Sequence, residues 1–156
     1  MPFLCFKRKQ KSSAGLQNED PNLRFIVISA DEDFYIRLRE IASSCNWQIG
    51  RATSVDEVEL LVKAKPTPIV VYERNAEDGN WRDKVRRIGS LPSQPCVFLG
   101  SQVADDYLLQ EVVRNQGYDV LAKSAPDEKL IKCLRFAWFW SQTKDKSQIS
   151  SPGRRA

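Results

Sequence analysis

Apolar residues alternate along the chain between short continuous runs and longer segments in which they recur every three or four positions. The short runs lie at residues 24–29, 47–52, 69–73, 96–100 and 118–122. Runs such as "RFIVIS" and "IVVYE" are apolar at nearly every position, which is typical of strands buried on both faces of a sheet. The run "WQIGRA" is more polar and predicts a half-buried strand.

The longer segments predict helices at residues 33–45, 54–64, 81–89, 104–117 and 126–142. Ser54 and Glu57 have the spacing of a capping box at a helix start. Gly89 and Gly117 predict helix ends, and Pro126 is well suited to a first helical turn.

Five strands and five helices in strict alternation predict an α/β fold with a doubly wound parallel sheet. In such a sheet the functional crevice lies at the carboxyl ends of the strands. Those ends are Ser29, Ala30 and Asp31; Arg51 and Ala52; Glu73; Gly100 and Ser101; and Ala122 and Lys123.

The pattern covers residues 24–141, which we expect to form one domain between a flexible N-terminal arm (1–23) and a flexible C-terminal tail (142–156). The arm begins with "PFLCF" followed by "KRKQK", an order opposite to that of a secretory signal, so we expect a cytoplasmic protein. A membrane anchor acylated on Cys5 is the alternative for the arm, and a disordered arm without membrane contact is favoured.

Charge and composition exclude several classes of function. The formal net charge is +4, yet residues 24–141 hold 16 Lys and Arg against 17 Asp and Glu, so the basic excess belongs to the termini. Binding of nucleic acid by the domain is therefore not expected. The chain has no histidine, which excludes Ser-His and Cys-His nucleophile pairs and removes the commonest metal ligand.

Two motifs carry a resemblance to a known family. "GYDVLAKSAPDEKL" (117–130) is similar to the segment around the lysine of response-regulator receiver domains, and "ERNAEDGNW" (73–81) is similar to their phosphoacceptor loop. The resemblance covers about 24–141 and implies a flavodoxin-like (βα)5 fold with strand order 2-1-3-4-5. It also implies a place in bacterial two-component signalling.

The resemblance further implies a set of phosphorylation residues, of which this chain keeps one. The acid pair that holds Mg²⁺ aligns with Ser29 and Ala30, and alanine offers no oxygen ligand. The phosphoacceptor aspartate aligns with Glu73, which is one methylene longer. The hydroxyl residue aligns with Gly100, followed by Ser101, and the aromatic residue of the fifth strand aligns with Val120. The lysine is present as Lys123.

We therefore interpret the chain as a degenerate receiver, or pseudo-receiver, that holds no metal or cofactor and has no enzymatic activity. Glu73 and Lys123 are predicted to form a fixed ion pair that replaces ordinary Mg²⁺-dependent phosphorylation; the alternative is an exposed strand end beside a solvated lysine. Asp31 and Asp33 could rescue metal binding, but a place in the first turn of the following helix, where acids meet the positive end of the helix dipole, is favoured.

Two other functions stay open at this point. One is a receiver phosphorylated at an unusual carboxylate. The other is a sensor in which the vacated acid pocket, beside Lys123, takes a small anion or a nucleotide.

The last helix carries more apolar residues than one buried stripe needs, among them Phe136, Trp138, Phe139 and Trp140. Receivers engage partners through their fourth helix, fifth strand and fifth helix. The resemblance thus predicts a partner interface at Arg114, Asp119, Lys132, Arg135 and Phe139. The expected partner is a histidine kinase, another regulator or a second copy of the chain; the alternative is that the two terminal segments cover these aromatic residues.

Overall fold

The computed structural model of the protein describes residues 22–150. The strands are β1 (Arg24–Ile28), β2 (Gln48–Ala52), β3 (Ile69–Glu73), β4 (Cys96–Ser101) and β5 (Asp119–Ala122). The helices are α3 (Glu32–Cys45), α4 (Val55–Ala64), α5 (Trp81–Gly89), α6 (Asp106–Arg114) and α7 (Asp127–Ser150). The alternation predicted from the sequence is confirmed.

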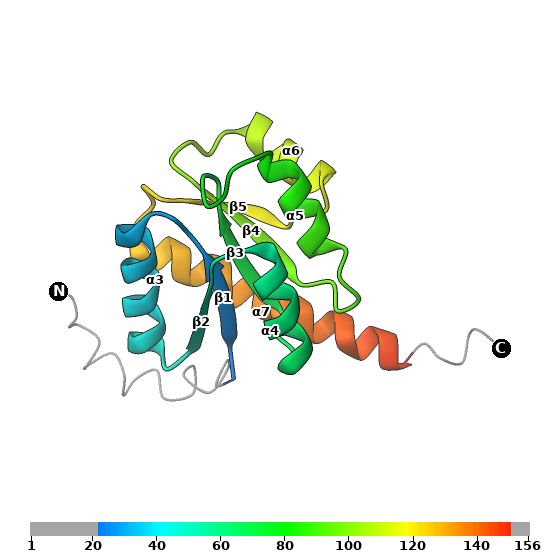
Figure 1. Cartoon of the computed structure of the whole chain (residues 1–156). Helices are drawn as coiled ribbons and strands as arrows, with labels where there is room; N and C mark the ends of the chain where they lie inside the picture. The colour runs from blue at the N-terminus through cyan, green and yellow to red at the C-terminus, as the bar shows by residue number, and fades with distance from the viewer. Residues whose placement is uncertain (1–21, 151–156) are drawn as a thin grey trace.

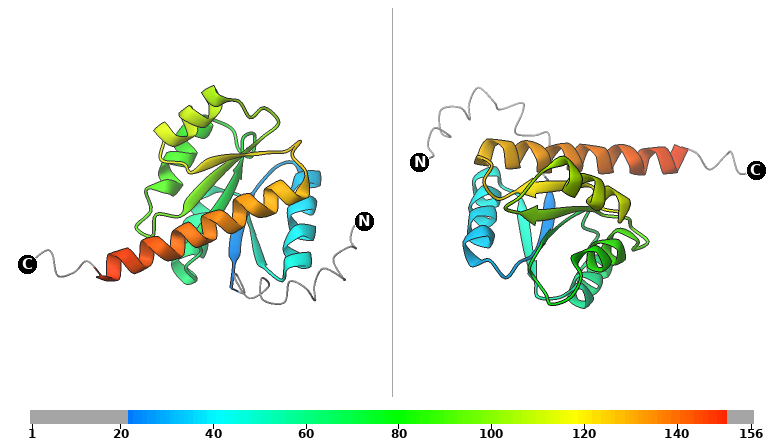
Figure 2. Two further views of the ribbon diagram at one scale, coloured as in Figure 1. Left: turned by 180° about the vertical axis from the view of Figure 1, so that it is seen from behind. Right: turned by 90° about the horizontal axis from the view of Figure 1, so that it is seen from above.

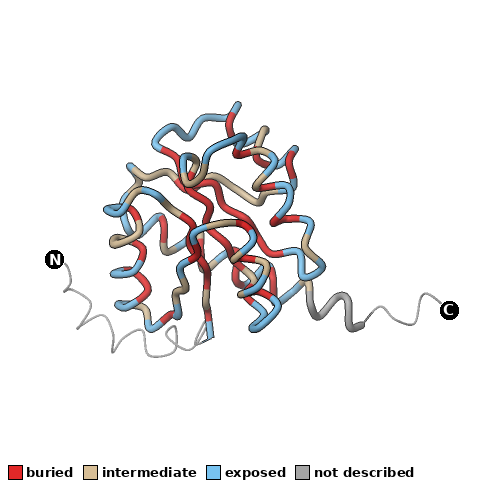
Figure 3. The backbone as a smooth tube through the Cα atoms, in the orientation of Figure 1, coloured by how far each residue is buried: buried red, intermediate tan, exposed pale blue. Residues whose placement is uncertain are grey.

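The five strands form one parallel sheet in the order β2-β1-β3-β4-β5, as predicted (Figure 1). Helices α3 and α7 cover one face of the sheet, and α4, α5 and α6 cover the other (Figure 2). The central strands are red along most of their length in Figure 3, because side chains on both faces are buried. This arrangement is the predicted flavodoxin-like fold.

Each face has its own apolar core, because successive side chains of a strand point to opposite faces. On the α3 and α7 side, Val27, Val71 and Phe98 pack against residues such as Leu134 of α7. On the other side, Ile28 and Tyr72 join a second cluster with residues of α4, α5 and α6. Two interleaved sets on one sheet explain why the strands are apolar without alternation.

Helix starts are fixed by polar caps. Ser54 accepts a hydrogen bond from the Glu57 N–H at 3.2 Å, and the Glu57 carboxylate accepts one from the Thr53 N–H at 2.8 Å. The capping box predicted at Ser54 and Glu57 is thus present, with the return bond one residue earlier than in the standard motif.

The boundaries at the two ends of the domain need correction. Leu23, placed in the arm by the sequence pattern, is fully buried in the core on the α3 and α7 side. Helix α7 continues to Ser150, eight residues beyond its predicted end at 142, so most of the predicted C-terminal tail is helical. Apolar periodicity ends near residue 142, but a helix can continue through polar residues without it. Residues 1–21 and 151–156, including Cys5, lie outside the described residues.

No helix within residues 22–150 is both long enough and apolar enough to cross a membrane.

Candidate functional site

The carboxyl ends of β1, β3 and β5 bring three charged side chains together. The ammonium of Lys123, which follows β5, donates to Asp31 Oδ2 at 2.8 Å and to Glu73 Oε2 at 3.0 Å. We name Lys123, Asp31 and Glu73 the Lys123 cluster. The ion pair predicted between Glu73 and Lys123 is present, whereas the pair with Asp31 was not predicted.

Glu73 is the buried member of the cluster, with 2% of its surface exposed. A buried carboxylate is costly unless it accepts hydrogen bonds. Besides Lys123, Glu73 accepts from the Ala30 N–H through Oε1 and from the Asn75 N–H through Oε2, both at 3.2 Å. The side chain therefore ties the loop after β1, the loop after β3 and the end of β5 to one another.

Asp31 has two roles. Its Oδ1 accepts from the Phe34 N–H and caps α3, one position before the first turn in which the sequence analysis places it, while its Oδ2 binds Lys123. The Ser29 hydroxyl accepts from the Asp31 N–H at 3.0 Å and so fixes this turn. The hydrogen bond from Lys123, followed by that from Phe34, lowers the pKa of Asp31 below its ordinary value of 3.8.

Lys123 stays charged in this environment. Burial acts to lower the pKa of Lys123, but the hydrogen bonds from its ammonium to Asp31 and Glu73 outweigh that effect and raise the pKa. The ammonium also lies 5.4 Å from the centroid of the Phe34 ring, within the range of a cation–π contact.

Phe34 fills the place beside Gly100, the position at which the receiver resemblance expects a hydroxyl side chain. A Cβ atom on Gly100 would lie 2.7 Å from Cε2 of Phe34, closer than packed atoms approach. The next residue, Ser101, is buried, and its hydroxyl accepts from the Val103 N–H at 3.2 Å. The crevice is thus occupied by an aromatic ring where a phosphoryl-binding hydroxyl would stand.

Arg37 completes the site and was missed by the sequence analysis. Its guanidinium donates to the carbonyl oxygens of Lys123 (2.6 Å) and Ala125, and to the Asp127 carboxylate at 2.7 Å. These hydrogen bonds hold the loop between β5 and α7 against α3. Nothing in the helical pattern around Arg37 distinguishes it from a solvated arginine.

The residues present do not fit the magnesium site of a receiver. Asp31 and Glu73 share the Lys123 ammonium, and Ala30 contributes an N–H donor rather than an oxygen ligand. Asp33, the other candidate ligand, belongs to the first turn of α3. Among the side chains that the structure describes, those of residues 22–144, no group of three or more His, Cys, Asp or Glu is arranged to hold a metal ion.

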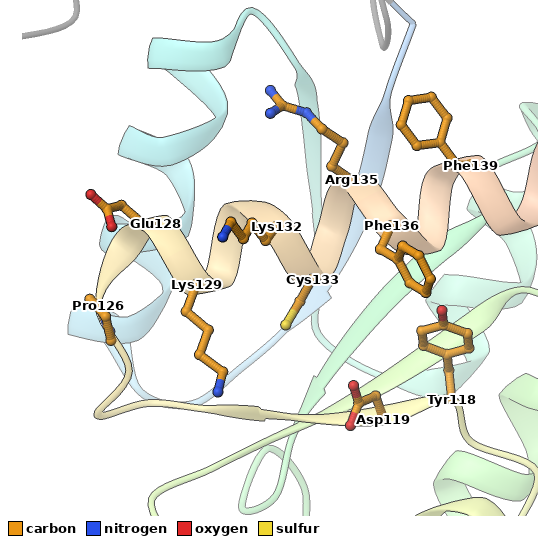
Figure 4. Close-up of a pocket in the computed structure, with 10 residues that line it drawn as sticks. All are labelled: Tyr118, Asp119, Pro126, Glu128, Lys129, Lys132, Cys133, Arg135, Phe136 and Phe139. Atoms are coloured by element: carbon orange, nitrogen blue, oxygen red, sulfur yellow. The ribbon is translucent and has the colours of Figure 1, made fainter.

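Four of the five residues predicted for the partner interface line one groove of about 650 Å³ between β5 and α7. They are Asp119, Lys132, Arg135 and Phe139 (Figure 4). Arg114 does not line this groove; it forms an ion pair with Glu111 on α6. Figure 4 shows Cys133 and Phe136, which the prediction had not included, pointing from α7 toward β5.

Solved structures similar to this one include receiver domains and response regulators. The chain aligns with a two-component response regulator from Clostridium difficile (TM-score 0.66, 15% identity, 75% of this chain and 96% of that chain). It aligns with the signal receiver domain of an HD domain-containing protein from Pseudomonas fluorescens (0.70, 17%, 81% and 93%). It also aligns with the chemotaxis protein CheY4 of Vibrio cholerae (0.65, 12%, 74% and 98%).

No family model matches the chain, and no curated protein matches it. The structural neighbours establish the receiver fold.

The contact between Gly100 and Phe34 predicts the effect of adding one methyl group. Gly100→Ala should lower the free energy of unfolding by about 1–3 kcal/mol, the usual cost of overpacking. Gly50→Ala in β2 is the matched control, because its Cβ would lie 3.6 Å from the nearest atom, Cγ1 of Ile26. Urea unfolding of both variants measures the difference; equal stability of Gly100→Ala and the parent protein would contradict the packing described for Phe34.

The lowered pKa of Asp31 predicts a pH dependence of stability. Because the folded state binds the proton less well than the unfolded state, the contribution is present above pH 3.8 and is lost as pH falls through the lowered folded pKa. Asp31→Asn keeps a good helix cap but removes the charge, so it should cost up to about 1 kcal/mol at pH 7 for this partly exposed pair. This loss of stability caused by Asp31→Asn should vanish at acidic pH, where the Asp31 carboxylate of the parent protein is protonated.

Asp105→Asn is the control for Asp31→Asn, because Asp105 caps α6 through the Leu108 N–H and forms no ion pair within the described residues. Urea unfolding at pH 7 and near pH 2.5 compares the two variants. A cost of Asp31→Asn that stays constant over this range would rule out the ion pair as its source.

Proposed function

We propose that this protein is a receiver-like interaction module of two-component signalling whose crevice is held in one state by its own side chains, without ordinary Mg²⁺-dependent phosphorylation. The observation that carries the proposal is the Lys123 cluster. The lysine that the receiver resemblance assigns to a phosphoryl group already binds two carboxylates of the same chain. The receiver fold of the neighbours supports a role in signal transduction.

The contacts of Glu73 support the absence of phosphoryl transfer. Both of its oxygens accept hydrogen bonds, and the side chain is almost completely buried. A nucleophile must be placed accurately against its phosphoryl donor, and an error of about 1 Å costs about a hundredfold in rate. Glu73 is directed into the fold, toward Ala30 and Lys123, so phosphorylation at this carboxylate is not favoured.

An anion sensor in the same crevice is not favoured either. A small anion would have to replace Asp31 or Glu73 at the Lys123 ammonium, and the ring of Phe34 fills the space beside Gly100. Displacing Glu73 would leave a buried carboxylate without its cation, which is strongly unfavourable.

The output of such a module is contact with a protein, and no step of the proposal requires catalysis. The groove between β5 and α7 holds four of the five residues predicted for that contact. One structural neighbour is a receiver domain dimer, that of beryllofluoride-activated NtrC4. A histidine kinase, another regulator and a second copy of the chain are the partners that this class of surface suits.

Titration with phosphoryl analogues tests the proposed function. With Mg²⁺ and beryllofluoride, we expect the amide NMR spectrum of the full chain to remain unchanged, because Lys123 and Glu73 are already paired. With Mg²⁺ and acetyl phosphate, mass spectrometry should detect no stoichiometric adduct. A receiver that has its acid pair serves as the positive control in the same buffers.

An adduct at Glu73, Asp31 or any other carboxylate, or shifts confined to the carboxyl ends of the strands, would contradict the proposed function.

A further inference from the structure

The exposed apolar side chains of the described residues are concentrated on two helices. Eight large hydrophobic side chains are exposed, and six of them belong to α6 and α7: Tyr107, Leu109, Val113, Phe136, Phe139 and Trp140. Phe136 is the most exposed of these, at 69%. Apolar surface gathered in this way marks a place where something binds.

Three of these six residues, Leu109, Phe136 and Phe139, line hollows in the surface. The hollow of about 650 Å³ between β5 and α7 adjoins a second of about 210 Å³ between α6 and α7, and the two share Asp119, Lys129 and Cys133. We name the two hollows together the β5 groove. Its walls include Val120, at the position where the resemblance expects an aromatic residue, and a smaller side chain leaves more of the groove open.

The charges that line the smaller hollow of the β5 groove favour a cationic occupant. Four acids lie along it, Asp105, Asp106, Asp119 and Glu128, and none forms an ion pair with a lysine or arginine of the described residues. In the smaller hollow three of these acids accompany a single cation, Lys129. The larger hollow has two of the acids and three cations, Lys129, Lys132 and Arg135, so the excess of negative charge lies on the α6 side. An occupant that suits the groove therefore presents aromatic side chains to its floor and positive charge to the α6 side.

We infer that the β5 groove is the binding site of this chain's own N-terminal segment, residues 3–11. That segment, "FLCFKRKQK", has two phenylalanines and a leucine followed by four cations in five residues. The apolar residues 3–6 match the apolar side chains of the groove, and the cations of residues 7–11 match its acids. The segment at the other end of the chain, 151–156, has two arginines and no aromatic residue, so it matches only the charge.

The part of the arm between this segment and the domain is long enough to reach the β5 groove. Ten residues, 12–21, join the segment to Asn22, and ten extended residues reach about 33–36 Å. From β1 to β5 the sheet has three strand spacings of about 4.8 Å each, so the groove lies within reach. A short tether also gives the segment a local concentration near the millimolar range, which favours the same chain over a second copy.

Arm binding bears on the proposed function, because the groove contains most of the predicted partner interface. If the proposed function holds, a partner protein has to displace residues 3–11 from the groove before it binds. The docking itself rests on the groove and on the sequence of the arm alone.

Zero-length carbodiimide cross-linking of the dilute full chain tests the docking. The reagent joins a lysine amine to a carboxylate with loss of water, so only groups in contact react. We expect Lys7, Lys9 or Lys11 to be linked to Asp105, Asp106, Asp119 or Glu128, as mapped by peptide mass spectrometry. Phe3→Ser/Phe6→Ser should reduce these links at least fivefold, whereas Leu16→Ser, in the connecting part of the arm, should not.

A mixture of ¹⁴N-labelled and ¹⁵N-labelled protein identifies the source of the segment. Links within one isotope class support docking of the chain on itself, and mixed pairs overturn it in favour of a second copy. Absence of links to the four acids, links spread over acids elsewhere on the surface, or links unaffected by Phe3→Ser/Phe6→Ser also overturn it. The links report the position of the arm whether or not the crevice accepts a phosphoryl analogue, so failure of this inference is distinguishable from failure of the proposed function.

Discussion

One ammonium group, that of Lys123, connects the loops at the carboxyl ends of three strands. Lys123, at the carboxyl end of β5, bonds to Asp31 after β1 and to Glu73 at the end of β3. Taking a lysine and a glutamate out of water is costly, and geometry this close is needed to recover that cost. The two further N–H donors to Glu73, from Ala30 and Asn75, bring the loops around the crevice into the same arrangement.

Packing and a second cation support the cluster. The ring of Phe34 lies against Gly100 and beside Lys123, so the absence of a side chain at residue 100 is what allows the ring to fill the crevice. Arg37 holds the backbone of Lys123 and Ala125 onto α3. The helix that forms one wall of the β5 groove therefore starts from a fixed point.

The order and type of the elements could be predicted from the sequence, because buried parallel strands and amphipathic helices have distinct apolar periods. The end of α7 could not, since its last turns are polar and lack a periodic stripe. Leu23 was assigned to the arm because one apolar residue before a strand has no period of its own. For the site, the types of residue at 73 and 123 were enough to predict an ion pair, since Glu73 ends one strand and Lys123 follows another at the same edge of the sheet.

The rest of the site depends on tertiary packing. The pairing of Asp31 with Lys123 was missed because a place in the first turn of a helix is enough to explain an acid at that position. The role of Phe34 was hidden because an apolar residue at the start of a helix is expected in any core. From the sequence, Gly100 indicated only that a hydroxyl side chain is missing at this position. The ring of Phe34 takes that place because α3 packs close to β4, which the sequence does not reveal.

The central claim is that Glu73 and Lys123 stabilise the crevice as a pair, and a double-mutant cycle measures this most directly. Glu73→Gln, Lys123→Met and the double variant would be compared with the parent protein by urea unfolding at pH 7. We expect the effects of the two single changes on the free energy of unfolding to be non-additive by about 0.5–3 kcal/mol, the range for residues in one salt-bridge network. Additive effects would show that the two side chains do not depend on each other and would contradict the account of a crevice held in one state by its own charges.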